Sequence, residues 1–379
     1  MPPSLSEFSH WATLALAAVV TASTLFPLIP THNWVVRLFD FPRVQFLILA
    51  LIASALALTL SILNIHRPTQ LTFLALTTLA SIIHLTYILP YTNLWTPTVE
   101  HADSHDLRLL ITNIDKRNNT PDLAAQAIND TNASAILLIE INDTLLESFD
   151  SIRDQYPHRL EQIRDDGLGI ALWSKHPIHD PEIKHLVSDR RASLHCTLDL
   201  DNNTRVKLIG LHPTPPALPV RQRDNADERY DSDIRDAELV LVARAVDEHA
   251  SQPDPDPVIV AGDFNDVAWS KTTRLFQKLS ALRDPRVGRG LLNTYHAAYP
   301  PLRYPLDHIF LSEGTRINDI TRIKIPGSDH FAVLAKIQVK PDEDPQTPTP
   351  DHDDLEDAQE AIQNGNSSAQ EHNESSRSL

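Results

Sequence analysis

The sequence predicts an α/β or α+β layered domain preceded by three membrane-spanning helices. Two observations predict this arrangement. The first hundred residues contain three long apolar stretches without a charged side chain, and the residues after them alternate short apolar runs with helical segments. Many strands with helices between them are typical of sheets covered by helices. With 379 residues, the chain is long enough for two or three such units.

The apolar stretches cover residues 11–29, 44–65 and 71–89. Each is close to the ~20 residues that an α-helix needs to cross ~30 Å of hydrocarbon. The first stretch resembles a secretory signal in length, but no basic segment precedes it, so we interpret residues 1–100 as a membrane anchor. His84 in the third stretch marks either an intramembrane site or, more commonly, a side chain packed between helices.

The basic residues that flank the spans are the sequence signal for orientation in the membrane. Arg37 and Arg43 lie in the first loop, whereas Arg67 and the terminal amine lie on the opposite side. This comparison is nearly even and does not fix the side. We expect a multi-pass protein of the cell membrane with its soluble domain outside the cytoplasm. Spans without charges favour anchoring over transport, which needs polar groups in the membrane.

The soluble domain is expected over residues 104–340. Its helical segments have apolar positions at three- and four-residue steps, and they cover residues 121–130, 233–250 and 272–280. Its strands are rich in leucine and β-branched residues, and they cover residues 107–114, 134–141, 168–174, 192–200, 205–212, 257–264, 306–312 and 331–339.

Charge is concentrated at the C-terminus. The whole chain has 33 Lys and Arg against 50 Asp and Glu, a formal net charge of −17. Residues 341–379 hold eleven acidic residues and one basic residue, a net charge of −10, and few large apolar side chains. We expect this tail to be disordered, because it buries too little surface to offset its ordering entropy. Its removal should leave catalysis intact.

Composition also excludes several kinds of site. An acidic chain argues against a broad electrostatic grip on nucleic acid, which needs basic surface. Cys196 is the one cysteine, so the chain has neither an intramolecular disulfide framework nor a cysteine-based zinc site.

Polar side chains stand at the ends of the predicted strands. Pairs that are two residues apart share one face of a strand, and a carboxylate that ends an apolar run needs a cation or solvent. Each alone is more often a turn or structural residue than a functional one, whereas all of them in this chain order are hard to dismiss. They are Asn113, Asp115, Glu140, His212, Asp263, Asn265, Asp307, Asp329 and His330.

The order of the surrounding motifs resembles the endonuclease/exonuclease/phosphatase superfamily, the group of exonuclease III, DNase I and neutral sphingomyelinase. The motifs are TNID, LLIE, GIALWS, LHPTPP, GDFN, LDHIF and SDH, and they span about 230 residues. The resemblance implies a four-layered α/β/β/α sandwich with a metal-dependent phosphoesterase site across the top of two sheets. It also suggests a membrane-anchored subgroup.

The resemblance implies a divalent-metal site, and the residue types agree with it. Mg²⁺ prefers oxygen ligands and is held by one or two carboxylates with waters and phosphate. Glu140 is the first expected ligand. Asp115 and Asn113 would complete its surroundings, and Asp329 would face the metal. Mg²⁺ is the expected ion, with Mn²⁺ as the alternative.

The same resemblance gives the catalytic groups. Asp263 would orient and deprotonate the attacking water, and Asn265 would hold the phosphate or the water. His330 would be oriented by Asp307 and kept partly cationic, since a carboxylate partner favours imidazolium. His212 would stabilise the phosphate or the leaving group.

Three further assignments stay open at this stage. Arg191 matches a phosphate-contacting arginine, with Arg190 or a plain surface role as alternatives. Asp166 lies next to the position expected for the carboxylate partner of His212, so that pairing is in doubt. The charged residues 221–233 form either a lid or, more simply, a solvated loop.

The substrate is inferred from the tether. Residues 90–107 reach at most ~55 Å, so the site stays close to the bilayer, where a lipid-linked substrate is concentrated. We therefore expect membrane lipids as partners and favour a lipid-linked phosphodiester or pyrophosphate. The alternative is a membrane-tethered nuclease acting on DNA or RNA. An inactive binding or scaffold protein is the third hypothesis, but the expected metal ligand and the Asp–His pair are both present.

Overall fold

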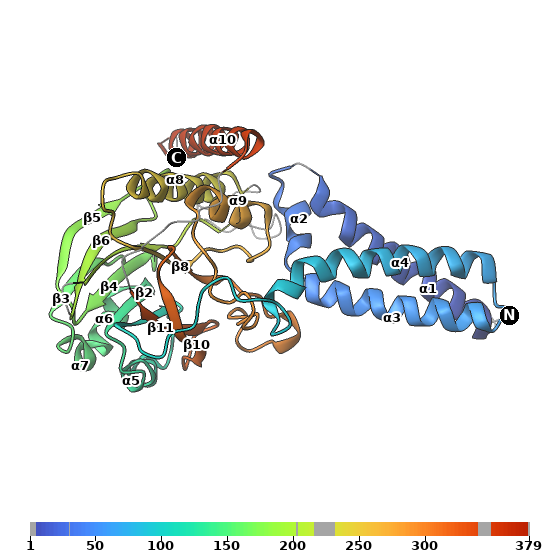
Figure 1. Cartoon of the computed structure of the whole chain (residues 1–379), viewed down its shortest axis with the longest axis horizontal. Coiled ribbons are helices and arrows are strands. Elements are labelled where there is room, and N and C mark those ends of the chain that lie inside the picture. The colour runs from blue at the N-terminus through green and yellow to red at the C-terminus, as the bar shows by residue number, and fades with distance from the viewer. Residues whose placement is uncertain (1–4, 30, 202–203, 216–231, 340–349, 378–379) are drawn as a thin grey trace. The chain divides into compact units, whose positions relative to one another are not determined.

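A computed structural model describes residues 5–29, 31–201, 204–215, 232–339 and 350–377 of the chain (Figure 1). It forms two compact units, Met1–Trp95 and Thr96–Leu379, each of which is described by itself. The charged stretch at residues 221–233 lies outside the described residues except for its last two positions.

The first unit contains three helices that are long and apolar enough to cross a membrane. They begin and end within a few residues of the predicted spans, apart from an earlier start of the first helix. Short helical turns connect and follow them. The elements are α1 (Leu5–Leu25), η1 (Phe26–Leu28), α2 (Trp34–Arg37), η2 (Leu38–Asp40), α3 (Arg43–Ile62), α4 (Arg67–Ile88) and η3 (Leu89–Tyr91).

Polar side chains of this unit are paired inside the helix bundle. His84 is fully buried, and its Nε2 lies 3.1 Å from Thr24 Oγ1. Arg43 forms an ion pair with Asp40 and lies 3.7 Å above the centroid of the Tyr87 ring. His84 is thus packed between helices, in line with the simpler of its two interpretations.

The second unit contains two mixed sheets. One has six strands in the order β10-β11-β1-β2-β4-β3, and the other has five in the order β5-β6-β7-β8-β9. The strands are β1 (Leu107–Asn113), β2 (Ala135–Ile141), β3 (His158–Gln162), β4 (Gly169–Ser174), β5 (Ile178–Lys184), β6 (Ser193–Leu200), β7 (Thr204–Leu211), β8 (Val258–Asp263), β9 (Asp307–Leu311), β10 (Arg316–Lys324) and β11 (Phe331–Gln338).

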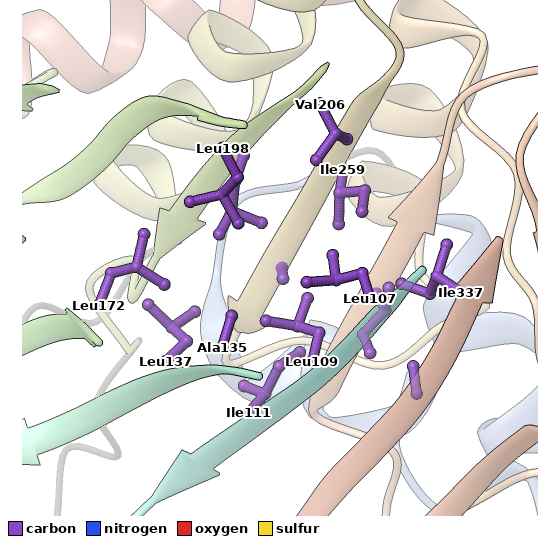
Figure 2. Close-up of a cluster of buried hydrophobic side chains, with 14 of the residues drawn as sticks. Leu107, Leu109, Ile111, Ala135, Leu137, Leu172, Leu198, Val206, Ile259 and Ile337 are labelled. Carbon is purple, nitrogen blue, oxygen red and sulfur yellow. The ribbon is translucent and has the colours of Figure 1, made fainter. Parts of the chain in front are cut away.

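The two sheets face each other across an apolar core. Leu109 and Leu137 from the six-stranded sheet pack with Leu198, Val206 and Ile259 from the five-stranded sheet (Figure 2). These side chains alternate with residues that face the outer layers, as the period of two in a strand requires. Two sheets with a shared core form the centre of the predicted sandwich.

Helices cover the outer face of each sheet and complete the four layers. On the six-stranded sheet, a second apolar cluster packs beneath α5 (Pro121–Asp130), α6 (Asp143–Ser148) and α7 (Asp150–Arg153). On the five-stranded sheet, a third cluster packs beneath α8 (Asp233–Ala250) and α9 (Lys271–Ser280). The predicted α/β/β/α sandwich is therefore confirmed.

The structure differs from the expected disorder of the acidic tail. Residues His352–Arg377 form α10, which packs on α8 and α9 (Figure 1). Ala358 and Ala361 join the apolar cluster of these helices, and a Cβ on Gly365 would lie 2.2 Å from Ala237 Cβ. Small residues thus allow a close helix contact, which a search for large apolar side chains does not detect.

Candidate active site

One edge of the six-stranded sheet collects five of the expected site residues, namely Asn113, Asp115 and Glu140 from β1 and β2 and Asp329 and His330 just before β11. Asn113 ends β1, and Glu140 interrupts the pairing of β2 with β4 at a bulge between Ile139 and Ile141. Because β1 and β2 are parallel, their carboxyl ends meet at the same edge. Glu140 has a φ of 64°, a left-handed conformation that is uncommon for this residue and clusters at functional sites.

The corresponding edge of the five-stranded sheet collects His212, Asp263, Asn265 and Asp307. β7 and β8 are parallel, so His212 after β7 lies beside Asp263 at the end of β8. Asp307 begins β9 and is paired directly with Asp263. Gly262 allows the close approach of β7 to β8 beside His212, since a Cβ there would lie 1.9 Å from Leu211 O. The order of the strands therefore places these polar groups together.

Asn113 connects the two edges. Its Nδ2 donates to Glu140 Oε1 at 3.2 Å and to Asp263 Oδ2 at 3.1 Å. Asp263 Oδ2 also lies 3.8 Å from His212 Nε2 and 3.7 Å from His330 Nε2. Groups from both sheets, distant in the sequence, thus converge on one carboxylate.

His330 and Asp307 form a tight pair beside that carboxylate. His330 Nδ1 lies 2.8 Å from Asp307 Oδ2, and both residues are buried. Burial by itself lowers the pKa of His330, but the charges of Asp307 and Asp263 outweigh it and raise this pKa to about 10. We therefore treat His330 as an imidazolium whose Nε2 faces Asp263.

Asp263 and His212 are perturbed in the opposite sense. Burial raises the pKa of the Asp263 carboxyl to about 7, although His330 favours its charged form. Burial, followed by the nearby charge of Arg191, lowers the pKa of His212 well below its usual value. The same carboxylate thus has one cationic and one neutral imidazole beside it, so the two histidines are suited to different roles.

A second group of carboxylates lies around Glu140. Lys116 N donates to Glu140 Oε2 at 3.3 Å, and Arg117 donates to both oxygens of Asp115. Burial raises the pKa of Asp329, and the charges of Asp115 and Glu140 raise it further. Acidic groups that repel one another in this way provide hard oxygen donors for a divalent cation.

These residues fit a divalent metal ion. Asp263, Asp307 and His330 also offer ligand atoms within 4.8 Å of one another. However, His330 is already engaged by Asp307 and carries a proton, so that trio opposes a second cation. The Glu140, Asp115 and Asp329 group has Arg117 beside Asp115 and His330 near Asp329. Its three carboxylates match the expected ligand set better.

The structure gives Asn265 and Arg191 defined hydrogen-bond partners. Asn265 N donates to Asp263 Oδ1, and Asn265 Nδ2 donates to Pro213 O, both at 3.0 Å. Arg191 Nη1 lies 2.9 Å from His212 Nδ1, so this buried arginine contacts the site directly. Asn265 and Arg191 thus lie beside Asp263 and His212, and their expected contacts with the phosphate or the water stay predictions.

The carboxylate partner considered for His212 is engaged elsewhere. Asp166 forms an ion pair with Arg164 at 2.7 Å and a longer one with Arg190 at 3.8 Å. This pairing lowers the pKa of Asp166 chiefly through the hydrogen bond from Arg164. Arg190, the alternative to Arg191 as a phosphate contact, lies beside Asp166 instead.

Sequence reasoning missed three residues that shape the site. Arg117 holds Asp115, and Tyr295 places its ring 4.8 Å from the His330 ring. Arg235 lies in the first turn of α8, and its Nη1 donates to Asn265 O at 2.9 Å. The basic pair that follows TNID was a usable signal for Arg117, whereas Tyr295 and Arg235 reach the site only through long-range packing.

Comparison with known proteins agrees with this geometry. The sequence profile of the Endonuclease/Exonuclease/phosphatase family matches residues 105–330, well over half of the chain. The chain belongs to this family. Members of the family are hydrolases of phosphoester bonds that depend on divalent metals. The predicted superfamily and the predicted enzyme class are therefore confirmed.

Solved structures with a similar fold share little sequence with the chain. A family protein from Bacteroides vulgatus is 14% identical, with a TM-score of 0.48 over 62% of this chain and 99% of that chain. TDP2 of D. rerio, solved with a single strand DNA product, is 17% identical, with a TM-score of 0.47 over 62% and 99%. Sphingomyelinase C from Streptomyces griseocarneus is 16% identical, with a TM-score of 0.42 over 60% and 98%. No curated protein sequence matches the chain.

Proposed function

We propose that the chain is a membrane-anchored, Mg²⁺-dependent phosphoesterase that hydrolyses a phosphodiester or pyrophosphate bond of a lipid-linked substrate. The observation that supports it best is the position of Asn113, which bonds Glu140 and Asp263 at once. A metal ligand and a base next to each other are what phosphoryl transfer to water requires.

Each group has a role that its environment favours. Glu140, Asp115 and Asp329 would hold the divalent ion, which would supply charge stabilisation to the phosphoryl oxygens. Asp263 accepts the proton of the attacking water, because its raised pKa brings it near neutrality. His330, kept cationic by Asp307, donates to a phosphoryl oxygen as negative charge develops.

The remaining groups act on the other side of Asp263. His212 is neutral, so its imidazole both accepts and donates a hydrogen bond, which suits the phosphate or the leaving oxygen. Arg191 lies against His212 and adds positive charge for the phosphate. Asn265 is fixed beside Asp263 and orients the phosphate or the water.

The lipid-linked substrate is supported by the tether and by charge. The described helices α1, α3 and α4 are apolar enough to span a membrane, and a short linker follows the last of them. A net charge of −17 disfavours the phosphate-tracking contacts by which nucleases hold long nucleic acids. A substrate that resides in the membrane is concentrated at such a site.

The test is a substrate panel with the full chain in lipid nanodiscs. Polyprenyl pyrophosphate, sphingomyelin, plasmid DNA and abasic DNA are offered with Mg²⁺, with Mn²⁺, and with EDTA. We expect metal-dependent turnover of a lipid substrate. Fast nicking of DNA without lipid turnover would instead support the nuclease hypothesis.

Matched variants separate catalysis from folding. Glu140→Gln and Asp263→Asn should abolish turnover while leaving the thermal unfolding transition in place. Glu182→Gln and Asp180→Asn make the same chemical changes at exposed positions of β5 and should keep full activity. Turnover of every substrate unaffected by the first two changes would show that the site is assigned to the wrong residues.

A further inference from the structure

The segment before β9 carries an exposed apolar protrusion beside the site. Residues 297–302 read Ala-Ala-Tyr-Pro-Pro-Leu, and the hydroxyl of the tyrosine is their only polar side-chain group. Residues 298–302 are all exposed. Tyr299 is 60% exposed and Leu302 is 56% exposed. Single exposed apolar residues are ordinary, but a continuous run of them indicates an interaction surface. We call residues 297–302 the apolar tip.

Backbone hydrogen bonds hold the apolar tip in one shape. Tyr299 N donates to His296 O at 3.2 Å, and Leu302 N donates to Tyr299 O at 2.9 Å, around the short helix η5 (Pro300–Leu302). Arg303 Nη2 donates to Ala297 O at 2.7 Å. A surface that is formed in advance loses less conformational freedom when it binds.

The apolar tip is also connected to the site. Ala297 N donates to Asp329 O at 2.7 Å, and the Tyr295 ring lies 4.8 Å from the His330 ring. The apolar tip is therefore hydrogen-bonded to the backbone of the segment that carries two residues of the site.

Two arginines flank the apolar tip. The guanidinium carbons of Arg303 and Arg322 lie 4.8 Å and 4.5 Å from the centroid of one ring, that of Phe331. Phe331 directly follows His330. Arginines beside exposed apolar side chains are typical of elements that lie in the headgroup region of an anionic bilayer.

The linker from the helices attaches to the same segment. Thr98 Oγ1 donates to Asp284 O, and Arg289 Nη2 donates to Val99 O. Six residues lie between Tyr91, at the end of η3, and Thr98, so that the two are at most ~24 Å apart. Trp95 in this linker is 45% exposed, as is common for aromatic residues at a membrane surface.

We propose that the apolar tip inserts into the headgroup region of the bilayer that holds α1, α3 and α4, with Arg303 and Arg322 at anionic headgroups. The site then opens toward substrates within the membrane surface. This inference rests on the membrane-surface function proposed above. A bilayer, rather than a protein partner, is the occupant that the tether, the exposed tryptophan and the two cations all favour.

The experiment places an environment-sensitive fluorophore on the apolar tip of the full chain. Leu302→Cys is labelled with NBD in nanodiscs of phosphatidylcholine and phosphatidylglycerol, with Glu182→Cys on exposed β5 as the matched control. The native Cys196 is buried, so it competes little for the label. We expect a blue-shifted emission and quenching by brominated lipids at position 302, on the order of several-fold above the control. Equal, water-like emission at both positions would overturn the inference.

A second measurement separates this inference from the proposed function. The double variant Tyr299→Ser with Leu302→Ser should lower turnover of a lipid substrate by roughly tenfold and leave turnover of bis(p-nitrophenyl) phosphate unchanged. Equal losses on both substrates would contradict a membrane role for the apolar tip. If the label is buried in lipid while no lipid phosphoester is hydrolysed, the proposed substrate fails and membrane insertion stands.

Discussion

Two clusters of buried charge lie side by side in this domain, and they are built differently. One is the catalytic cluster of Glu140, Asp263, Asp307 and His330. The other, which we call the support network, consists of Arg235, Asp236, Asp266 and Ser270. Asp263 and Asp266 are three residues apart in one loop, yet one belongs to each cluster.

Hydrogen bonds in the support network match donors with acceptors. Arg235 donates to Asp236 at 2.9 Å and lies 3.3 Å from Asp266, while Ser270 Oγ donates to Asp266 at 2.7 Å. His308 contacts Asp266 O through Nε2 at 2.9 Å. Buried charges that are paired in this way fix the loop but have no capacity left for a ligand.

The catalytic cluster is left incomplete. Within the described part of the chain, Asp307 Oδ1 has no hydrogen-bond partner, and the pKa values of Asp263 and Asp329 are raised chiefly by burial. Energetically unfavourable carboxylates of this kind persist where function needs them. Carboxylates of the support network are thus bonded to Arg235 and Ser270, whereas the catalytic cluster keeps an unbonded oxygen on Asp307 and carboxyls with raised pKa values.

The largest effect is expected from Asp263→Asn. Without its base, turnover should fall by on the order of a thousandfold or more. Stability should not fall, because burial raises the pKa of Asp263 from 3.8 to about 7, so the carboxyl costs stability increasingly above about pH 4 and fully above about pH 7. Turnover and the unfolding temperature in EDTA at pH 8 measure both. A large loss of stability would place Asp263 in the support instead.

The same substitution three residues later should act in the opposite way. Asp266→Asn leaves Arg235 with one buried carboxylate fewer and should destabilise the domain by roughly 3–5 kcal/mol. Urea unfolding checks this. The comparison between the clusters fails if Asp266→Asn preserves the unfolding midpoint.

The pH dependence sharpens the comparison further. Asp263 must be ionised to accept a proton, so kcat/KM should rise about tenfold per pH unit below its pKa and then level off. The cation of His330 lowers the pKa of Asp263. His330→Gln should therefore move this acidic limb to higher pH as well as reduce the rate. If the acidic limb of the pH profile stays at the same pH in His330→Gln, His330 does not influence the pKa of the catalytic base.

His195 provides a smaller effect away from the site. Burial, followed by Lys184, lowers its pKa from 6.5 to about 4, and Ser193 Oγ lies 3.0 Å from its ring. The folded state binds this proton less well than the unfolded state does. The stability contributed by neutral His195 is therefore complete above pH 6.5 and decreases toward pH 4, by up to about 3 kcal/mol. Unfolding at a series of pH values should show this slope, and His195→Gln should reduce it.

The smallest effect is expected from removing α10. Truncation after residue 350 should leave turnover unchanged and lower the unfolding temperature by a few degrees, because the helix adds alanine contacts and exposed ion pairs such as Lys278–Asp354. A large change in turnover would show that α10 acts on the site.

The central part of the fold could be predicted from the sequence, but its edges could not. The eight predicted strands are all present, and the three missed strands are β3, β5 and β10. Each of these lies at an edge of its sheet. Edge strands face solvent and carry charged residues, as in Arg159, Glu182 and Lys324, so no apolar run marks them. α10 was missed for a related reason, since alanine and glycine make its contacts.

The residues of the site could be predicted because strand ends mark them. In motifs such as TNID and GDFN, polar residues directly follow an apolar run. Parallel pairing then brings the carboxyl ends of these strands together. Arg235 and Tyr295 lie in a helix and a loop without such a signal. The left-handed conformation of Glu140 also depends on the bulge in β2, which the sequence alone does not indicate.

The most direct test of the convergent site is a double-mutant cycle on turnover. Glu140→Gln, Asp263→Asn and the double variant are compared with the unchanged protein at saturating Mg²⁺. Asn113 donates hydrogen bonds to both carboxylates, which places them in one catalytic site. The double variant should therefore lose little more activity than the worse single variant. Losses that multiply independently would mean that the two carboxylates serve separate sites.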